Sequence, residues 1–216
     1  MFKAVPVHIN FLLVVGVVMA EIKVLIEGYA KQVKGGWIAS STVTLIKSNG
    51  KNIIVDPGCN RKKLFEVLKK EKLSVSDIDF VILTHAHADH TLLCGIFDKA
   101  RVLNAVEIYD NDRQVEYGNF VPDTDVEIIQ TPGHCVEHCS VLISTEKGTV
   151  VVAGDVFWWV ESEKQIVDVE KVDDAHPLET NMVELIKSRK KIIAVAEFII
   201  PGHGKMFKAQ KKVCQG

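Results

Sequence analysis

The sequence Thr84-His85-Ala86-His87-Ala88-Asp89-His90 decides the fold of this chain. It places four side chains that can bind a metal within six residues, directly after the apolar run Phe80-Val-Ile-Leu83. So short and uniform an apolar run indicates a buried strand. Because alternate residues of an extended segment point the same way, His85 and His87 can share one metal ion, while Asp89 and His90 reach a neighbouring ion.

Four other apolar runs also end at a side chain that can bind a metal. These runs begin at Ile53, Ile128, Val150 and Ile199, and they lead to Asp56, His134, Asp155 and His203. If the strands lie side by side, the five strand ends converge along one edge of the sheets, where loops can form a cleft. Imidazole nitrogens and carboxylate oxygens suit zinc, and also iron or manganese.

The hydrophobic pattern predicts alternating strands and helices. Asn49-Gly50 is a strong two-residue hairpin turn, and Pro177 fits the first turn of a helix that buries Leu178, Met182, Leu185 and Ile186. Residues 156–175 lack periodicity and are expected to form a loop. We expect an α/β fold, a four-layered αβ/βα sandwich of two mixed sheets. The expected strands are 21–28, 42–48, 52–56, 80–83, 126–130, 140–144, 149–153 and 198–200, and the first helix is 61–73.

Composition indicates one globular domain. The chain has 216 residues, of which 47% are hydrophobic and 25% charged, with a formal net charge of −2. This balance argues against a dedicated nucleic-acid binder without excluding nucleic acid as a substrate. The five cysteines are odd in number and lack zinc-ribbon spacing, which favours a reducing compartment, the cytoplasm.

Residues 1–20 are an apolar N-terminal extension with three competing interpretations. A signal peptide would need a stronger positive region and a cleavage site. A transmembrane helix would need about twenty predominantly apolar residues, and Pro6, His8 and Asn10 interrupt the segment. We favour the third interpretation, an addition to the fold or an upstream start with Met19 as initiator. No stable membrane span is expected, and the catalytic domain is expected to cover residues 21–216.

Four motifs in order resemble the metallo-β-lactamase superfamily over roughly residues 21–208: His-x-His-x-Asp-His (85–90), Thr-Pro-Gly-His (131–134), Ala-Gly-Asp (153–155) and Pro-Gly-His-Gly (201–204). The resemblance implies two divalent metal ions, zinc above all, with iron or manganese as alternatives. It implies that Asp56 orients the site by hydrogen bonding. The implied ligands are His85, His87 and His134 for the first metal, Asp89, His90 and His203 for the second, and Asp155 as the bridge between them.

Three further segments are similar to one subgroup of this superfamily. They are Glu27-Gly-Tyr, the strand sequence Ser-Thr-Val-Thr-Leu-Ile at 41–46, and the phenylalanine that follows Pro-Gly-His-Gly. Other subgroups fit less well. Flavodiiron proteins carry a glutamate where His87 stands, several β-lactamases carry a cysteine near the second metal, and the RNA-processing nucleases insert an extra domain or arm.

The resemblance implies a hydrolase in which a metal-bound hydroxide attacks a carbonyl or phosphorus, with Asp89 and Asp155 holding the second metal and the bridge. Our first hypothesis for the substrate is a small ester, thioester or lactone, because a fold without insertions leaves a small open cleft. One alternative is an endonuclease acting on RNA or DNA, which the subgroup likeness supports and the net charge does not. The other is a di-iron redox protein. A homodimer is compatible with the sequence.

Several other residues have weaker claims to a role in the site. His138 is expected to make a structural hydrogen bond, and His176 to be an exposed neighbour of a helix start. Phe157-Trp158-Trp159 fits a pocket wall and ordinary core equally well. The acidic residues of the following stretch are expected to form a solvated face: Glu161, Glu163, Asp168, Glu170, Asp173 and Asp174.

Overall fold

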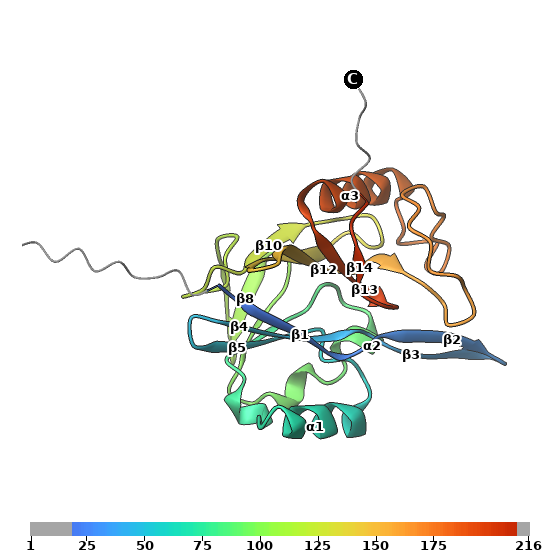
Figure 1. Cartoon of the computed structure of the whole chain (residues 1–216). Helices are drawn as coiled ribbons and strands as arrows, with labels where there is room; N and C mark the ends of the chain where they lie inside the picture. Colours follow the sequence, from blue (N-terminus) through green and yellow to red (C-terminus); the bar gives the residue numbers. More distant parts are fainter. Residues whose placement is uncertain (1–18, 211–216) are drawn as a thin grey trace, which may run out of the picture.

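The computed structural model of the protein describes residues 19–210 (Figure 1). The expected extension at residues 1–20 therefore lies outside the described residues, apart from Met19 and Ala20, and so does Cys214. Within residues 19–210, no helix combines the length and apolar character needed to cross a membrane.

The first sheet contains seven strands in the order β1-β4-β5-β6-β7-β8-β9. β5, β6 and β7 run parallel, whereas the other neighbours are antiparallel, so the sheet is mixed. The strands are β1 (Glu21–Ile26), β4 (Val43–Ser48), β5 (Lys51–Val55), β6 (Phe80–Ile82), β7 (Arg101–Leu103), β8 (Glu107–Asp110) and β9 (Arg113–Glu116).

The second sheet contains five strands in the order β10-β11-β12-β13-β14, and only β12 and β13 are parallel. Its strands are β10 (Glu127–Gln130), β11 (Cys139–Thr145), β12 (Gly148–Trp158), β13 (Phe198–His203) and β14 (Phe207–Lys208). A separate hairpin of β2 (Tyr29–Val33) and β3 (Gly36–Ser40) pairs only with itself. It extends beside the edge where the strands of both sheets end (Figure 1).

The two sheets pack face to face between two helices, α1 (Arg61–Lys70) and α3 (Met182–Val195) (Figure 1). The apolar core between the sheets includes Phe80 from the first and Val141 from the second. Leu64 of α1 and Leu185 of α3 are buried in separate clusters on the outer faces. The expected four-layered αβ/βα sandwich is confirmed. The short helices are η1 (Val75–Asp77), α2 (Ala88–Thr91) and η2 (Cys94–Ile96).

Local sequence explains several element boundaries. Asn49 and Gly50 both have positive φ, as the expected hairpin turn between β4 and β5 requires. The Asn60 side chain accepts a hydrogen bond from the Lys63 backbone and begins α1. Asn181 caps α3 in the same way through the backbone N–H groups of Val183 and Glu184.

Two expectations about the second half are wrong. The helix does not begin at Pro177: residues 177–179 form a turn, Leu178 is fully exposed, and α3 starts after the Asn181 cap. The expected loop also begins later than residue 156, because β12 continues to Trp158 beside its parallel neighbour β13. Asp155 therefore lies within a strand rather than after one. The hairpin β2–β3 and the strands β7, β8, β9 and β14 were not expected.

Candidate metal centre

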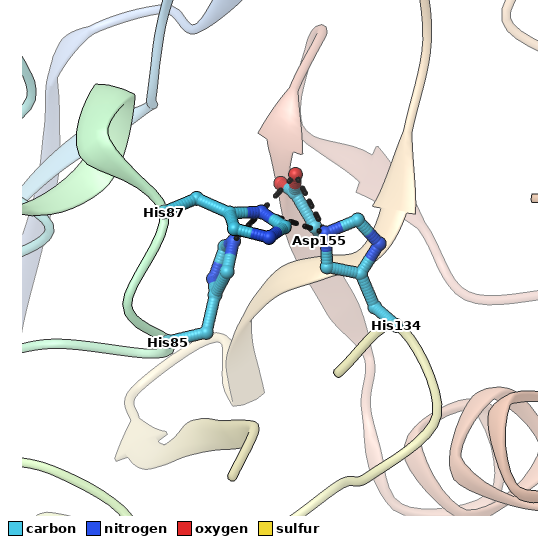
Figure 2. A group of neighbouring side chains, drawn as sticks. All are labelled: His85, His87, His134 and Asp155. Carbon is cyan, nitrogen blue, oxygen red and sulfur yellow. Dashed lines mark hydrogen bonds and ion pairs between the residues drawn. The ribbon is translucent and has the colours of Figure 1, made fainter. Parts of the chain in front are cut away.

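All seven side chains expected to bind metal lie together at one edge of the two sheets. They form two groups, and within each group the potential ligand atoms lie within 4.8 Å of one another. The first group is His85, His87, His134 and Asp155, shown in Figure 2, and the second is Asp89, His90 and His203. The geometric expectation of convergence therefore holds, and whether these side chains bind metal stays a prediction.

The atoms of the first group surround a common centre. Nδ1 of His87 lies 2.9 Å from Nε2 of His85 and 3.1 Å from Nε2 of His134. Oδ2 of Asp155 lies 3.6 Å from Nε2 of His134 and 3.9 Å from Nε2 of His85. Two nitrogens at zinc-bonding distance in a tetrahedral site lie about 3.3 Å apart, so these separations fit a shared cation.

Asp155 also reaches the second group. Its Oδ1 lies 3.2 Å from Nε2 of His90, and its Oδ2 lies 3.6 Å from Nε2 of His203. Oδ2 of Asp89 lies 3.2 Å from Nε2 of His203 and 4.0 Å from Nε2 of His90. A single carboxylate thus stands between the two groups, in the position expected of a bridge.

Each of the five imidazoles uses its other ring nitrogen to contact a hydrogen-bond acceptor outside the centre. Such contacts fix the ring orientation and the tautomer, leaving the inward nitrogen free to bind a cation. The Thr84 hydroxyl can accept from His85 because it donates its own proton to Asp56 Oδ2 at 2.8 Å. The contacts are His85 Nδ1 to Thr84 Oγ1 (3.0 Å), His87 Nε2 to Glu179 Oε2 (3.1 Å), His90 Nδ1 to Asp56 Oδ2 (2.9 Å), His134 Nδ1 to Asp173 Oδ2 (2.7 Å) and His203 Nδ1 to the Tyr29 carbonyl (3.1 Å).

The electrostatics of the centre favour positive charge. Burial by itself would raise the pKa of Asp155, but the charges of His90 and His203 outweigh burial and hold that pKa well below its usual range. Burial lowers the pKa of His203, but the Asp155 charge and the hydrogen bonds to Asp155 and Asp89 together raise it to about 9. His90 Nε2 and Asp155 Oδ1 face each other, yet neither buried atom makes a well-formed hydrogen bond. Divalent cations would satisfy these atoms, so the residues present fit a metal site.

Asp56 lies behind the ligands rather than in the cavity. It is buried and accepts hydrogen bonds from the Thr84 backbone N–H and hydroxyl, both at 2.8 Å, besides facing His90. Its position suits a residue that orients the imidazoles, and it lines none of the described cavities.

A cavity of about 440 Å³ opens over both groups. Its floor includes His87, Asp89, His134, Asp155 and His203, and no described residue of its lining is a lysine or arginine. A larger cavity of about 970 Å³ lies behind the β2–β3 hairpin and touches none of the seven side chains. The smaller cavity is therefore the one that bears on the chemistry. Its remaining walls are Trp37, Leu92, Trp158, four alanines (Ala30, Ala39, Ala88 and Ala175), Cys59 and His176.

The structure also shows which of the remaining candidate residues lie at the site. His138 makes the expected structural hydrogen bonds, with the Thr131 hydroxyl and the Asp155 backbone N–H. Phe157 and Trp159 are buried in the core, whereas Trp158 lines the cavity. His176 is exposed, as expected, but its ring centroid lies 4.2 Å from that of His87.

One expectation about the acidic stretch is wrong, and two contributors were missed. Asp173 does not belong to a solvated face: it is buried and hydrogen-bonded to His134. Glu179 and Trp37 were not expected near the site. These three residues lie in segments without a periodic pattern or in an unexpected hairpin, so no local signal in the sequence could have assigned them.

Comparison with known proteins agrees with this geometry. Residues 37–108 match the family described as the metallo-beta-lactamase superfamily. The chain is 34% identical over 202 residues to metallo-beta-lactamase domain-containing protein 1 of Xenopus laevis, covering 88% of this chain and 82% of the relative. The chain belongs to the metallo-β-lactamase superfamily. Metal-dependent hydrolases are characteristic of this superfamily.

Other relatives support the same family assignment for this metallo-β-lactamase chain. The human protein of the same name is 30% identical over 178 residues, and the match covers 76% of this chain and 62% of the relative. The subgroup indicated by the three short sequence segments is thus confirmed. A Methanocaldococcus jannaschii protein named a probable metallo-hydrolase is 31% identical over 166 residues, covering 70% of each chain.

Solved structures show the same fold. A Thermotoga maritima protein classed with the metallo-β-lactamases superposes with a TM-score of 0.63 at 21% identity, covering 88% of this chain and 99% of that one. AidC, a dizinc quorum-quenching lactonase, has a TM-score of 0.56 at 16% identity, covering 83% of this chain and 79% of that one. The chemotaxis sensor ODP, solved as its peroxy di-iron species, has a TM-score of 0.58 at 16% identity, covering 88% of this chain and 86% of that one.

Proposed function

We propose that this protein is a dinuclear metal-dependent hydrolase that acts on a small ester, thioester or lactone. One observation carries the proposal: seven metal-binding side chains face two adjoining centres, and every imidazole among them is held from behind by a hydrogen-bond acceptor. This arrangement fixes the tautomers that metal ligation requires.

The donor set supports zinc, with iron or manganese as alternatives, because it consists of imidazole nitrogens and carboxylate oxygens. His85, His87 and His134 would hold the first metal, Asp89, His90 and His203 the second, and Asp155 would join them. Two divalent cations at such a site would make water nucleophilic at neutral pH and would polarise the substrate's carbonyl group.

The chain's own residues would orient the reactants. Burial raises the pKa of Asp89, but hydrogen bonding to His203 and the charges of His90 and His203 together outweigh burial and leave the pKa below its usual value, so the carboxylate is ionised. Asp89 lines the cavity and can accept a hydrogen bond from the attacking water. Trp37, Leu92 and Trp158 offer an apolar wall to the acyl part of a substrate. No separate side-chain general acid is assigned.

The cavity supports a small neutral substrate over the alternatives. Its described lining contains no lysine or arginine to neutralise a phosphodiester backbone, which argues against an endonuclease. The structural likeness to a di-iron protein keeps a redox role as the second candidate, because the same ligand types suit iron. The described cysteines are all free, which supports action in the cytoplasm. We assign the activity to a single domain spanning residues 21–216.

The test combines metal analysis with activity. The purified full chain should contain two metal ions and hydrolyse members of a panel of aryl esters, thioesters and lactones, and not labelled RNA. His87→Ala and Asp155→Ala should each abolish hydrolysis, while Asp112→Ala, an exposed aspartate between β8 and β9, should not. Full activity in both site variants, or cleavage of RNA alone, would refute the proposal, and iron with oxygen reduction would favour the redox candidate.

A further inference from the structure

The loop between β12 and α3 supplies two of the acceptors that hold imidazoles in place. We call residues 171–181 the strap. Asp173 of the strap lies 2.7 Å from Nδ1 of His134, and Glu179 lies 3.1 Å from Nε2 of His87. Both imidazoles belong to the first group, so one segment contacts two of its three histidines from outside.

The second group has no contact of this kind with the strap. His90 is held by Asp56, the residue after β5, and His203 by the carbonyl of Tyr29 in β2. His85 of the first group is held by Thr84, two residues after the end of β6. These partners lie in or next to strands of the scaffold, whereas the strap contains neither strand nor α-helix.

The strap is anchored firmly enough to orient side chains. The buried Arg189 of α3 donates hydrogen bonds to the carbonyls of Val169 and Lys171, just before Asp173. At the other end, the Asn181 backbone N–H donates to the carbonyl of Gly133 at 2.7 Å, next to His134 itself. The strap thus holds a defined position relative to the loop after β10 that carries His134.

The two strap carboxylates differ in burial. The side chains of Asp173 and His134 are each 1% exposed, so their contact is a short hydrogen bond sheltered from water. The Glu179 side chain is 55% exposed, and solvent weakens its contact with His87. Ala175 and His176, between them, line the cavity over the centre. One short segment therefore contacts both the first group and the space where a substrate would lie.

We propose that Asp173 and Glu179 are positioning residues for the first metal, and that the strap tunes the affinity of this metal while leaving the second metal unaffected. The inference rests on the proposed function, since it assumes two metal ions. Removing a hydrogen-bond partner of a metal-binding imidazole typically weakens metal binding about 10-fold to 100-fold, because the ring loses its orientation and part of its basicity.

The experiment is a zinc titration of the metal-free full chain against a competing chromophoric chelator, repeated with cobalt to follow each site by its visible absorption. Asp173→Ala should weaken one site about 10-fold to 100-fold and leave the other unchanged. Glu179→Ala should weaken the same site by a smaller factor, because its contact with His87 is exposed to solvent. Glu179→Gln keeps an oxygen that can accept a hydrogen bond from His87, so it should lose less zinc affinity than Glu179→Ala. The weakened site should be the one whose cobalt spectrum His87→Ala removes.

The matched control is Asp174→Ala, which removes an exposed carboxylate next to Asp173 and should leave both sites unchanged. Asp56 contacts His90 directly and His85 through Thr84, so Asp56→Asn should weaken both sites, in contrast to the strap variants. If Asp173→Ala fails to fold, Glu179→Ala still tests the inference, because the Glu179 side chain is exposed and its removal leaves the core intact. Equal weakening of both sites by Glu179→Ala, or none, overturns the inference with the proposed function intact. A wild-type chain that binds fewer than two metals overturns both.

Discussion

The carboxylate of Asp56 lies 2.9 Å from Nδ1 of His90, and both side chains are buried. The same carboxylate accepts two hydrogen bonds from Thr84, and the Thr84 hydroxyl in turn contacts His85. One buried aspartate therefore orients imidazoles of both groups, which makes it the point where stability and metal binding are linked.

We predict that Asp56→Asn destabilises the metal-free protein by about 2–3 kcal/mol. An amide cannot accept from three donors at once, and a buried donor without a partner costs about 1–3 kcal/mol. Urea unfolding followed by circular dichroism measures the change, with Asp112→Asn as the exposed control. Unchanged stability would mean that the surroundings of Asp56 rearrange to satisfy Thr84 and His90.

Gly202 makes room for the central carboxylate. A Cβ atom built on Gly202 would lie 1.8 Å from Oδ1 of Asp155, and its backbone φ is not in the left-handed region. We predict that Gly202→Ala displaces Asp155 and weakens binding at both metal sites. Calorimetric zinc titration would measure this loss. Gly118→Ala, where the added Cβ meets nothing within 4 Å, is the control, and normal binding of two metals by Gly202→Ala would contradict the steric argument.

The β2–β3 hairpin presents different side chains to the two cavities. Trp37 lines the cavity over the metal centre, whereas Ile38, on the opposite face, lines the larger one. Both are about half exposed, so neither truncation should disturb the fold. Trp37→Ala should raise KM about 10-fold for an apolar acyl substrate, because about 1–2 kcal/mol of apolar contact is lost. Equal kinetic effects of Trp37→Ala and Ile38→Ala would exclude this role.

Burial lowers the pKa of His138 to about 3 in the folded protein. Below the ordinary pKa of about 6.5, the unfolded chain binds a proton at this position and the folded chain does not. The contribution of neutral His138 to stability is therefore complete above pH 6.5 and decreases as the pH falls toward 3, by up to about 1.4 kcal/mol per pH unit.

We predict that the metal-free wild type loses its stability advantage over His138→Gln progressively between pH 6.5 and pH 4. Urea unfolding of both proteins across this range provides the measurement. If the stabilities of the two proteins change with pH in parallel, His138 has the same pKa in the folded and unfolded chains, which would contradict the prediction.

The sequence predicted best where local pattern and spacing are sufficient. Phe80 to Leu83 could only be a buried strand, and the alternation after it placed His85 and His87 together. The hairpin at Asn49-Gly50 followed from two residues that tolerate positive φ. The sequence failed at Pro177, since a helix start signal there competes with the Asn181 cap, and the cap prevails.

The order of the motifs along the chain was enough to indicate the superfamily by resemblance, and the resemblance implied the seven candidate ligands. The sandwich followed from strand and helix periodicity, which is a local property of the sequence. Only the tertiary structure decided that Asp173 and Glu179 hold imidazoles, that Trp37 and Trp158 line one cavity, and that Asp155 stands between the two groups. Each of these relationships joins segments far apart in the sequence. Such contacts depend on how strands and loops pack in space, and they leave no periodic trace in the chain.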